Sequence, residues 1–196
     1  MKQIVLLHGG TSFNSYERYL EDLKTKSLDY DRLRPSKRWR DSVVEAFSND
    51  DVLLPSFPNT SNAQYDEWAL YFEKLVPHLR DNVHIVAHSL GGAFIAKYLS
   101  QHPLQTPLRQ LLLVAPPYSD ETSEDLGDFT LHTVTQLNKS CDEVHIFFSK
   151  DDPIVPFSEL AKFQADLPNA ICHVFEDRGH FLQDTFPELI EILKQK

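Results

Sequence analysis

Short apolar runs alternate with longer amphipathic segments along the whole chain. The apolar runs are rich in β-branched residues and apolar at consecutive positions, which is typical of strands buried on both faces of a parallel sheet. They predict strands over Gln3–Leu7, Asp51–Leu54, Val83–Ala87, Gln110–Val114, Glu143–Phe148 and Ala170–Phe175.

The segments between these runs repeat apolar residues at helical spacing. Tyr16, Leu20 and Leu23, for example, fall on one face of a helix. The pattern predicts helices over Tyr16–Lys26, Ala63–Leu79, Gly92–Ser100, Leu131–Asn138, Phe157–Leu167 and Pro187–Lys194. Strand and helix in alternation indicate a three-layer α/β fold, in which right-handed crossovers place helices on both faces of the sheet.

Length and composition fit one folded domain over residues 1–196. The chain is 41% hydrophobic and 24% charged, and no repeat or low-complexity tract divides it. No apolar run approaches the roughly 18 residues that cross a bilayer, and the first run leads into His8-Gly9-Gly10 instead of a signal-peptide cleavage site. Two cysteines, Cys141 and Cys172, are too few for a disulfide framework. We therefore expect a cytoplasmic protein without a membrane partner.

The formal net charge of −10 argues against a nucleic-acid partner, because binding to phosphate backbones needs a basic surface. The segment Arg32–Arg40 is a basic exception within the region 27–49. Its simplest interpretation is a solvated part of a surface insertion. The alternative is that it attracts an anionic substrate or partner.

The most informative motif follows the third predicted strand, at the edge of a parallel α/β sheet where ligands bind. It reads Ala87-His88-Ser89-Leu90-Gly91-Gly92 and leads directly into a helix. A serine in a strand-to-helix turn, with small residues two positions before and after it, is the pattern of a nucleophile elbow. Ser89 is therefore the predicted nucleophile, although Ala87 stands where glycine is commoner. The alternative is a glycine-rich turn without chemistry.

A serine hydroxyl needs a base within hydrogen-bonding distance. His180 differs from the other histidines because it follows the last strand in a loop at the same edge, and the order Ser, Asp or Glu, His is the expected one. His88 precedes the nucleophile and is expected to support the elbow. Structural roles are expected for His78, His84, His102, His132, His145 and His173.

The acid is expected after the fifth strand, where Asp151 and Asp152 precede Pro153. We favour Asp152, because a residue before proline is restricted to an extended backbone that can aim its carboxylate inward. Asp151 remains an alternative, as does an Asp-Pro turn whose carboxylate only caps the backbone.

Acyl transfer also needs backbone N–H groups that stabilise a developing oxyanion. One expected donor is the N–H of Leu90, directly after the nucleophile at a helix N-terminus. The other is expected in the loop after the first strand, at Gly10, with Thr11 as the nearest alternative.

The sequence resembles the α/β-hydrolase superfamily, and within it the compact serine hydrolases that include the retinoblastoma-binding-protein-nine-like and YdeN-like proteins. The resemblance rests on His8-Gly9-Gly10-Thr11, Pro55-Ser56-Phe57-Pro58-Asn59, Tyr65-Asp66-Glu67-Trp68, the elbow, Asp151-Asp152-Pro153-Ile154-Val155-Pro156 and Gly179-His180-Phe181. It implies a six-stranded, all-parallel sheet with helices on both faces, esterase-like activity and no cofactor. The region 27–49 resembles this family less sharply, and its role stays open.

Two classes of function follow. The first is a serine hydrolase that cleaves a small ester, thioester or amide through an acyl-enzyme on Ser89, with a small-molecule acyl substrate as its partner. The second is a protein-interaction module on the same scaffold, whose protein partner is unidentified. No metal site is expected, because His84 and His88 are four apart on a strand and its turn instead of a helix. The acidic stretch 118–128 is expected to shape the substrate site.

Overall fold

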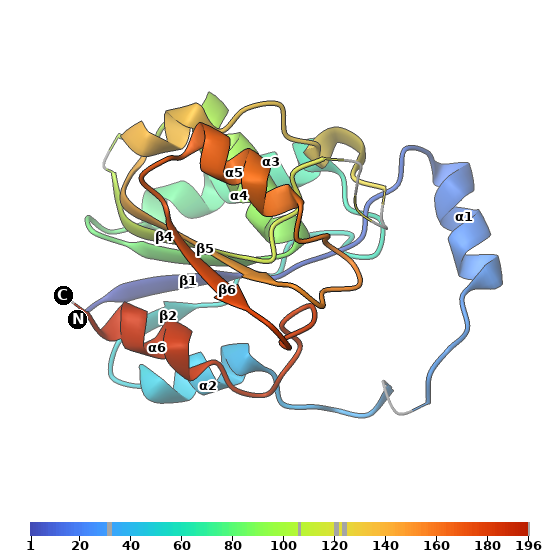
Figure 1. The fold of residues 1–196 in the computed structure, drawn as a ribbon, viewed down its shortest axis with the longest axis horizontal. Helices are drawn as coiled ribbons and strands as arrows, with labels where there is room; N and C mark the ends of the chain where they lie inside the picture. Colours follow the sequence, from blue (N-terminus) through green and yellow to red (C-terminus); the bar gives the residue numbers. More distant parts are fainter. Residues whose placement is uncertain (31–32, 106, 120–121, 123–124, 196) are drawn as a thin grey trace.

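Six strands form one sheet in the computed structural model, which describes residues 1–30, 33–105, 107–119, 122 and 125–195 (Figure 1). The strands are β1 (Gln3–Leu7), β2 (Asp51–Leu53), β3 (His84–His88), β4 (Leu108–Val114), β5 (Cys141–Ser149) and β6 (Ile171–Phe175). Their order across the sheet is β2-β1-β3-β4-β5-β6, and every neighbouring pair is parallel. The predicted fold class is confirmed.

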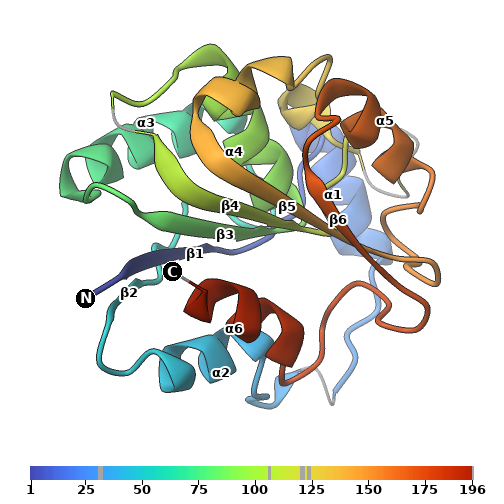
Figure 2. The same cartoon turned by 60° about the vertical axis from the view of Figure 1, so that its left-hand side comes forward.

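Helices cover both faces of this sheet, as Figure 2 shows most clearly. On one face lie α3 (Tyr65–Leu75), α4 (Leu90–Gln101) and α5 (Glu159–Asp166), and on the other lie α2 (Trp39–Ala46) and α6 (Pro187–Lys194). Short 3-10 helices are η2 (Val76–His78), η3 (Gly127–Phe129) and η4 (Thr135–Lys139). The remaining helix, α1 (Tyr16–Thr25), buries none of its residues and stands apart from both layers in Figure 1.

Alternation along the strands divides the core into two clusters, because successive strand side chains point to opposite faces. In β1, Val5 and Leu7 join the cluster under α3 and α4, which contains Trp68. Ile4 and Leu6 join the cluster under α2 and α6, which contains Trp39 and Phe186. These four apolar side chains of β1 are fully buried, which explains the uninterrupted apolar run in the sequence.

Two helical predictions differ from the structure. The segment 131–138, predicted as an α-helix, forms only the 3-10 helix η4. Helix α2 was not predicted. It lies within the region 27–49, whose role stayed open, and only its first two residues belong to the basic run Arg32–Arg40 that was interpreted as solvated. Its N-cap residue is Arg38, whose side chain has no oxygen that could accept a hydrogen bond from the first turn. The Arg38 backbone N–H instead donates to Asp41 Oδ2 at 2.7 Å. Trp39 and Val43, one turn apart, bury one face of α2 against the sheet.

The two ends of the described chain lie next to each other at the amino edge of the sheet (Figure 1). The Lys2 side chain donates hydrogen bonds to the carbonyl oxygens of Leu193 and Gln195, the second at 3.0 Å. The loops that carry Ser89, Asp152 and His180 leave the opposite, carboxyl edge of the strands.

Candidate active site

Ser89 occupies a sharp turn between β3 and α4. Its backbone has φ 53° and ψ −126°, a left-handed conformation that is strained for any residue with a side chain. The Ser89 N–H donates to Val114 O at 2.8 Å, and its carbonyl accepts from Gly92 N–H at 2.7 Å. A Cβ on Gly91 would lie 2.3 Å from His8 O, so the turn requires glycine there. The elbow predicted from the sequence is therefore present in its geometry.

His180 lies directly against the Ser89 hydroxyl. The distance from His180 Nε2 to Ser89 Oγ is 2.8 Å, and both side chains are buried. The imidazole is oriented by Asp152, whose Oδ2 is 2.9 Å from His180 Nδ1. Because the carboxylate accepts from Nδ1–H, the Nε2 lone pair faces Ser89, and the serine O–H can donate to it.

The Asp152 carboxylate is held by its own loop. Its Oδ1 accepts from the backbone N–H groups of Ile154 and Val155 at 2.8 and 3.0 Å, and its side chain is fully buried. These bonds leave Oδ2 for His180. Asp152, the residue favoured from the sequence, thus contacts the backbone of its own loop with one oxygen and the imidazole of His180 with the other.

Asp151 points elsewhere, although it precedes Asp152 directly. Its Oδ1 accepts from the Ser149 hydroxyl at 2.5 Å and from Gly179 N–H at 2.8 Å. These hydrogen bonds hold the pKa of the exposed Asp151 carboxyl below its usual range, the Ser149 bond most strongly. Asp151 therefore fastens the loop that carries His180 without touching the imidazole.

His88 contacts His180 from the other side. Its Nε2–H donates to the backbone carbonyl of His180 at 2.9 Å, and the two ring centroids are 4.9 Å apart. Trp39 of α2 lies edge-on to the His88 ring at 6.1 Å between centroids. Burial lowers the pKa of His88 to about 3, and the neighbouring His180 adds to that shift. A neutral His88 can lie beside His180 without opposing a positive charge on the His180 ring.

The buried His88 predicts a specific pH dependence of stability. The unfolded chain binds a proton on this residue below about pH 6.5, whereas the native state excludes it down to about pH 3, so the free energy of unfolding should fall as the pH falls through this window. In His88→Gln, the slope between about pH 4.5 and 6 should be shallower by up to about 1.4 kcal/mol per pH unit, measured by urea unfolding. His132→Gln, at an exposed site, is the matched control. Equal slopes in His88→Gln and the unsubstituted protein would contradict the prediction.

The loop after β1 lies against the elbow. A Cβ on Gly9 would be 3.1 Å from Ser89 Cβ, so the two backbones approach closely. The His8 ring holds this loop: Phe57 N–H donates to Nε2 at 2.9 Å, which leaves Nδ1–H to donate to Gly9 O at 2.7 Å. Burial lowers the pKa of His8, in keeping with a neutral ring that accepts at Nε2.

The predicted oxyanion donors differ in how they are engaged. Thr11 N–H donates to Thr60 O at 2.8 Å, so this alternative is already bonded. Leu90 begins α4, where the first N–H groups have no acceptor within the helix. Within the described residues, the Gly10 N–H has no hydrogen-bond acceptor either. Gly10 and Leu90 therefore retain N–H groups for a ligand beside Ser89.

Ser89 and His180 open into a shallow cleft of about 480 Å³. Its lining comes from six segments and comprises His8, Gly9, Gly10, Thr11, Arg40, Ser56, Thr60, His88, Ser89, Ile154, His180 and Leu182. The acidic stretch 118–128 was expected to shape this site. Its residues 120, 121, 123 and 124 lie outside the described residues, and none of the others lines the cleft. Asp125 instead accepts hydrogen bonds from Ser12 and Asn14.

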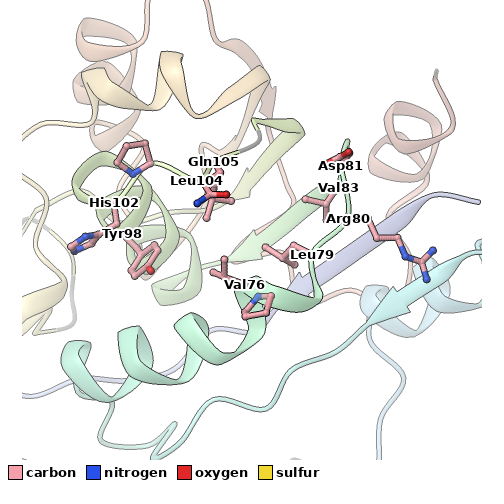
Figure 3. A pocket seen from close by; sticks show the side chains of 11 residues that line it. Val76, Leu79, Arg80, Asp81, Val83, Tyr98, His102, Leu104 and Gln105 are labelled. Atoms are coloured by element: carbon pink, nitrogen blue, oxygen red, sulfur yellow. The ribbon is translucent and has the colours of Figure 1, made fainter.

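A second cavity, of about 440 Å³, lies at the other end of the strands (Figure 3). Val76 and Leu79 line it from η2 and the residue after it, and Tyr98 and His102 line it from the end of α4. Among the described residues, those around it include no serine, threonine or cysteine that could act as a nucleophile. The cleft beside Ser89 is therefore the candidate active site.

The described residues contain no cluster of three or more histidine, cysteine, aspartate or glutamate side chains that could hold a metal ion. His84 is instead bonded through Nδ1 to Gln110 Oε1 at 2.9 Å, and His145 through Nδ1 to His173 Nε2 at 3.0 Å. None of the helices among the described residues has the length and apolarity that crossing a membrane requires.

Sequence reasoning missed several residues of the cleft. Ser56 and Thr60 follow β2 at the carboxyl edge, so the rule that located Ser89 and His180 could also have found them. Arg40 lies within the basic run that was singled out, but its place beside Ser89 depends on α2, which was not predicted. Ile154 and Leu182 follow the acid and the base, and no pattern marks them.

Comparisons with known proteins agree with this geometry. A family model described as serine hydrolase matches residues 34–193. The chain is 28% identical to serine hydrolase RBBP9 of Rattus norvegicus over 160 residues, which cover 80% of this chain and 83% of that protein. It is 31% identical to the putative hydrolase YdeN of Bacillus subtilis (strain 168) over 137 residues, or 68% of this chain and 70% of that protein. The crystal structure of the B. subtilis ydeN gene product superposes with a TM-score of 0.77 at 22% identity, covering 98% and 97% of the two chains.

Proposed function

This chain belongs to the serine hydrolase family and is a hydrolytic enzyme, and we propose that it cleaves a small ester, thioester or amide through an acyl-enzyme on Ser89. The observation that supports this proposal is the continuous hydrogen-bonded series from Asp152 through His180 to Ser89 Oγ, with distances of 2.9 and 2.8 Å.

In the first half-reaction, Ser89 Oγ attacks the carbonyl carbon while His180 Nε2 accepts the hydroxyl proton. The new Oγ–C bond gives a tetrahedral intermediate whose oxyanion accepts hydrogen bonds from the N–H groups of Gly10 and Leu90. When this intermediate collapses, the bond to the leaving group breaks and His180 donates its proton to that group. Asp152 stabilises the imidazolium while it carries the proton.

In the second half-reaction, water attacks the acyl-enzyme. His180 accepts one proton from the water as its oxygen bonds to the carbonyl carbon, and the proton then returns to Ser89 Oγ as the Oγ–C bond breaks. The products are a carboxylic acid and the alcohol, thiol or amine released earlier. No cofactor takes part in these steps.

The cleft supports a short substrate. Its volume of about 480 Å³ is in the range of small-molecule sites, and it is open to solvent. The backbone of the loop after β1 approaches Ser89 closely, which favours a compact acyl group over a long chain. A small-molecule acyl substrate is therefore the proposed partner of the site.

A role as a binding module alone does not require this arrangement. Asp152 is buried and accepts three hydrogen bonds, one of them from His180, and His180 in turn faces a serine with a strained backbone. A strained residue of this kind costs folding free energy, which catalysis explains and binding alone does not. The geometry thus favours hydrolysis over the interaction hypothesis.

Covalent labelling tests this proposal. A fluorophosphonate probe should modify the protein at one site, and peptide mass spectrometry should place the phosphonyl group on Ser89. The same preparation should hydrolyse a short p-nitrophenyl ester, and prior labelling should abolish that turnover. Labelling of a different residue, or a folded protein that neither reacts with the probe nor turns over esters, would refute the proposal.

A further inference from the structure

One cation lines the cleft beside the nucleophile. Arg40, the second residue of α2, is partly buried and contributes to the same lining as Ser89 and His180. Within the part of the chain that the structure describes, the Arg40 guanidinium makes no hydrogen bond or ion pair. A guanidinium has five N–H donors, so partial burial without a partner leaves a strong donor group available to a ligand.

Burial is the largest cause that lowers the pKa of Arg40; the negative charge of Asp41 partly offsets this effect, and the positive charge of Arg38 adds to it. Asp41, the next residue, accepts from the Arg38 backbone N–H at 2.7 Å, and the Arg38 guanidinium donates to Leu182 O at 3.0 Å. None of the described residues that line the cleft is an aspartate or a glutamate. A protein with a formal net charge of −10 thus presents a positively charged side chain in its catalytic cleft.

The charge of Arg40 acts on the two histidines that hold the loops beside Ser89 and His180. Burial is the main cause of the lowered pKa values of His8 and His88, and the positive charge of Arg40 lowers both further. Two hydroxyl side chains, Ser56 and Thr60, line the same cleft and can donate to an oxyanion. Arg40, Ser56 and Thr60 together are called the anion subsite below.

We propose that the anion subsite binds a carboxylate or phosphate group of the substrate, so that the enzyme prefers acyl compounds that carry a negative charge near the scissile bond. This inference rests on the proposed acyl transfer at Ser89 and adds the substrate class. The planar guanidinium matches the paired oxygens of either anion, and its partial burial strengthens the attraction relative to bulk water.

Two pairs of esters locate the anion on the substrate. On the acyl side, mono-p-nitrophenyl adipate is compared with p-nitrophenyl hexanoate, which has the same chain length and no carboxylate. On the leaving-group side, 4-acetoxybenzoate is compared with its methyl ester. In at least one pair, kcat/KM should be about tenfold to a hundredfold higher for the anionic ester, the range expected of a charge-assisted hydrogen bond. 4-Acetoxyphenyl phosphate then distinguishes phosphate from carboxylate on the leaving group.

Substitution at Arg40 assigns the preference. Arg40→Gln should remove it, and Arg40→Lys should keep part of it, because a lysine retains the charge but not the paired geometry. Lys37→Gln is the matched control: it removes a cation of the same basic run that is exposed and pairs with Glu45 at 2.7 Å outside the cleft. The higher kcat/KM for the anionic ester should persist in Lys37→Gln. In the unsubstituted protein this preference should shrink as the salt concentration is raised.

The inference and the proposed function fail in different ways. If Ser89 is labelled and the neutral esters are hydrolysed, but the ratio of kcat/KM values is the same in Arg40→Gln and the unsubstituted protein, the anion subsite is refuted and the hydrolase proposal stands. If no ester is hydrolysed and Ser89 is not labelled, the hydrolase proposal fails. The subsite is then decided by calorimetric titration with adipate, whose binding should be at least about tenfold weaker in Arg40→Gln; equal or undetectable binding refutes it.

Discussion

Replacing Ser89 by alanine should lower kcat for a short p-nitrophenyl ester by about 10⁶-fold, since no other group can form the acyl-enzyme. The fold should persist, because alanine at φ 53° carries about the same backbone strain as serine and fills nearly the same space. The measurement is initial-rate kinetics on protein whose thermal unfolding matches that of the unsubstituted chain.

Residual turnover also carries information. The N–H groups of Gly10 and Leu90 and the shape of the cleft stay in place in Ser89→Ala, so a rate above that in water should remain. Ser36→Ala, an exposed serine in the segment before α2, is the matched control and should keep full activity. If Ser89→Ala retained more than about one hundredth of the activity, the nucleophile would have to be another residue.

Replacing Asp152 by asparagine should lower kcat by about 10⁴-fold. One oxygen of the Asp152 carboxylate accepts from His180 Nδ1–H, and the other accepts from two backbone N–H groups. Asparagine has only one side-chain oxygen, so it cannot accept on both sides. If the amide nitrogen faces His180, the imidazole must place its proton on Nε2, where it can no longer accept from Ser89. The loss should appear mainly in kcat, because the residues that line the cleft are untouched.

Asp151→Asn provides the comparison at the adjacent position. Asp151 bonds only Ser149 and Gly179 among the described residues and does not reach the imidazole, so its replacement should cost less than about tenfold in kcat. Measurement of both variants on the same ester separates the acid from its neighbour. A larger loss at Asp151 than at Asp152 would reverse the assignment.

The central strands of the sheet were predictable because they are buried on both faces, whereas the edge strands β2 and β6 are only partly buried. In β1, for example, Ile4 through Leu7 are all fully buried, so the sequence is apolar at every one of these positions. Helix α2 escaped prediction because its cap is an arginine and because charged residues surround its apolar positions. The spacing of Trp39, Val43 and Phe47 was the available signal, and it covers only two turns.

The site was predictable where one rule applies to every strand. Ser89, Asp152 and His180 each follow a strand at its carboxyl end, so the topology alone brings their loops together. The contact of His88 with the His180 carbonyl and the place of Arg40 depend on how loops and α2 fold over that edge. The choice between Asp151 and Asp152 depends on which side chain turns inward, and proline at position 153 gave only a partial indication.

The neighbouring chain ends have a consequence for the order of the elements. Because the Lys2 side chain donates to Gln195 O at 3.0 Å, a short linker could connect residues 1 and 195 without disturbing the sheet. New ends could open among residues 27–30, which are all exposed and lie beyond α1. Such a circular permutant would be synthesised with β1 and the His8 loop last, after the serine, aspartate and histidine loops. The three catalytic loops would therefore keep their places at the carboxyl edge of the sheet although the order of the elements along the chain had changed.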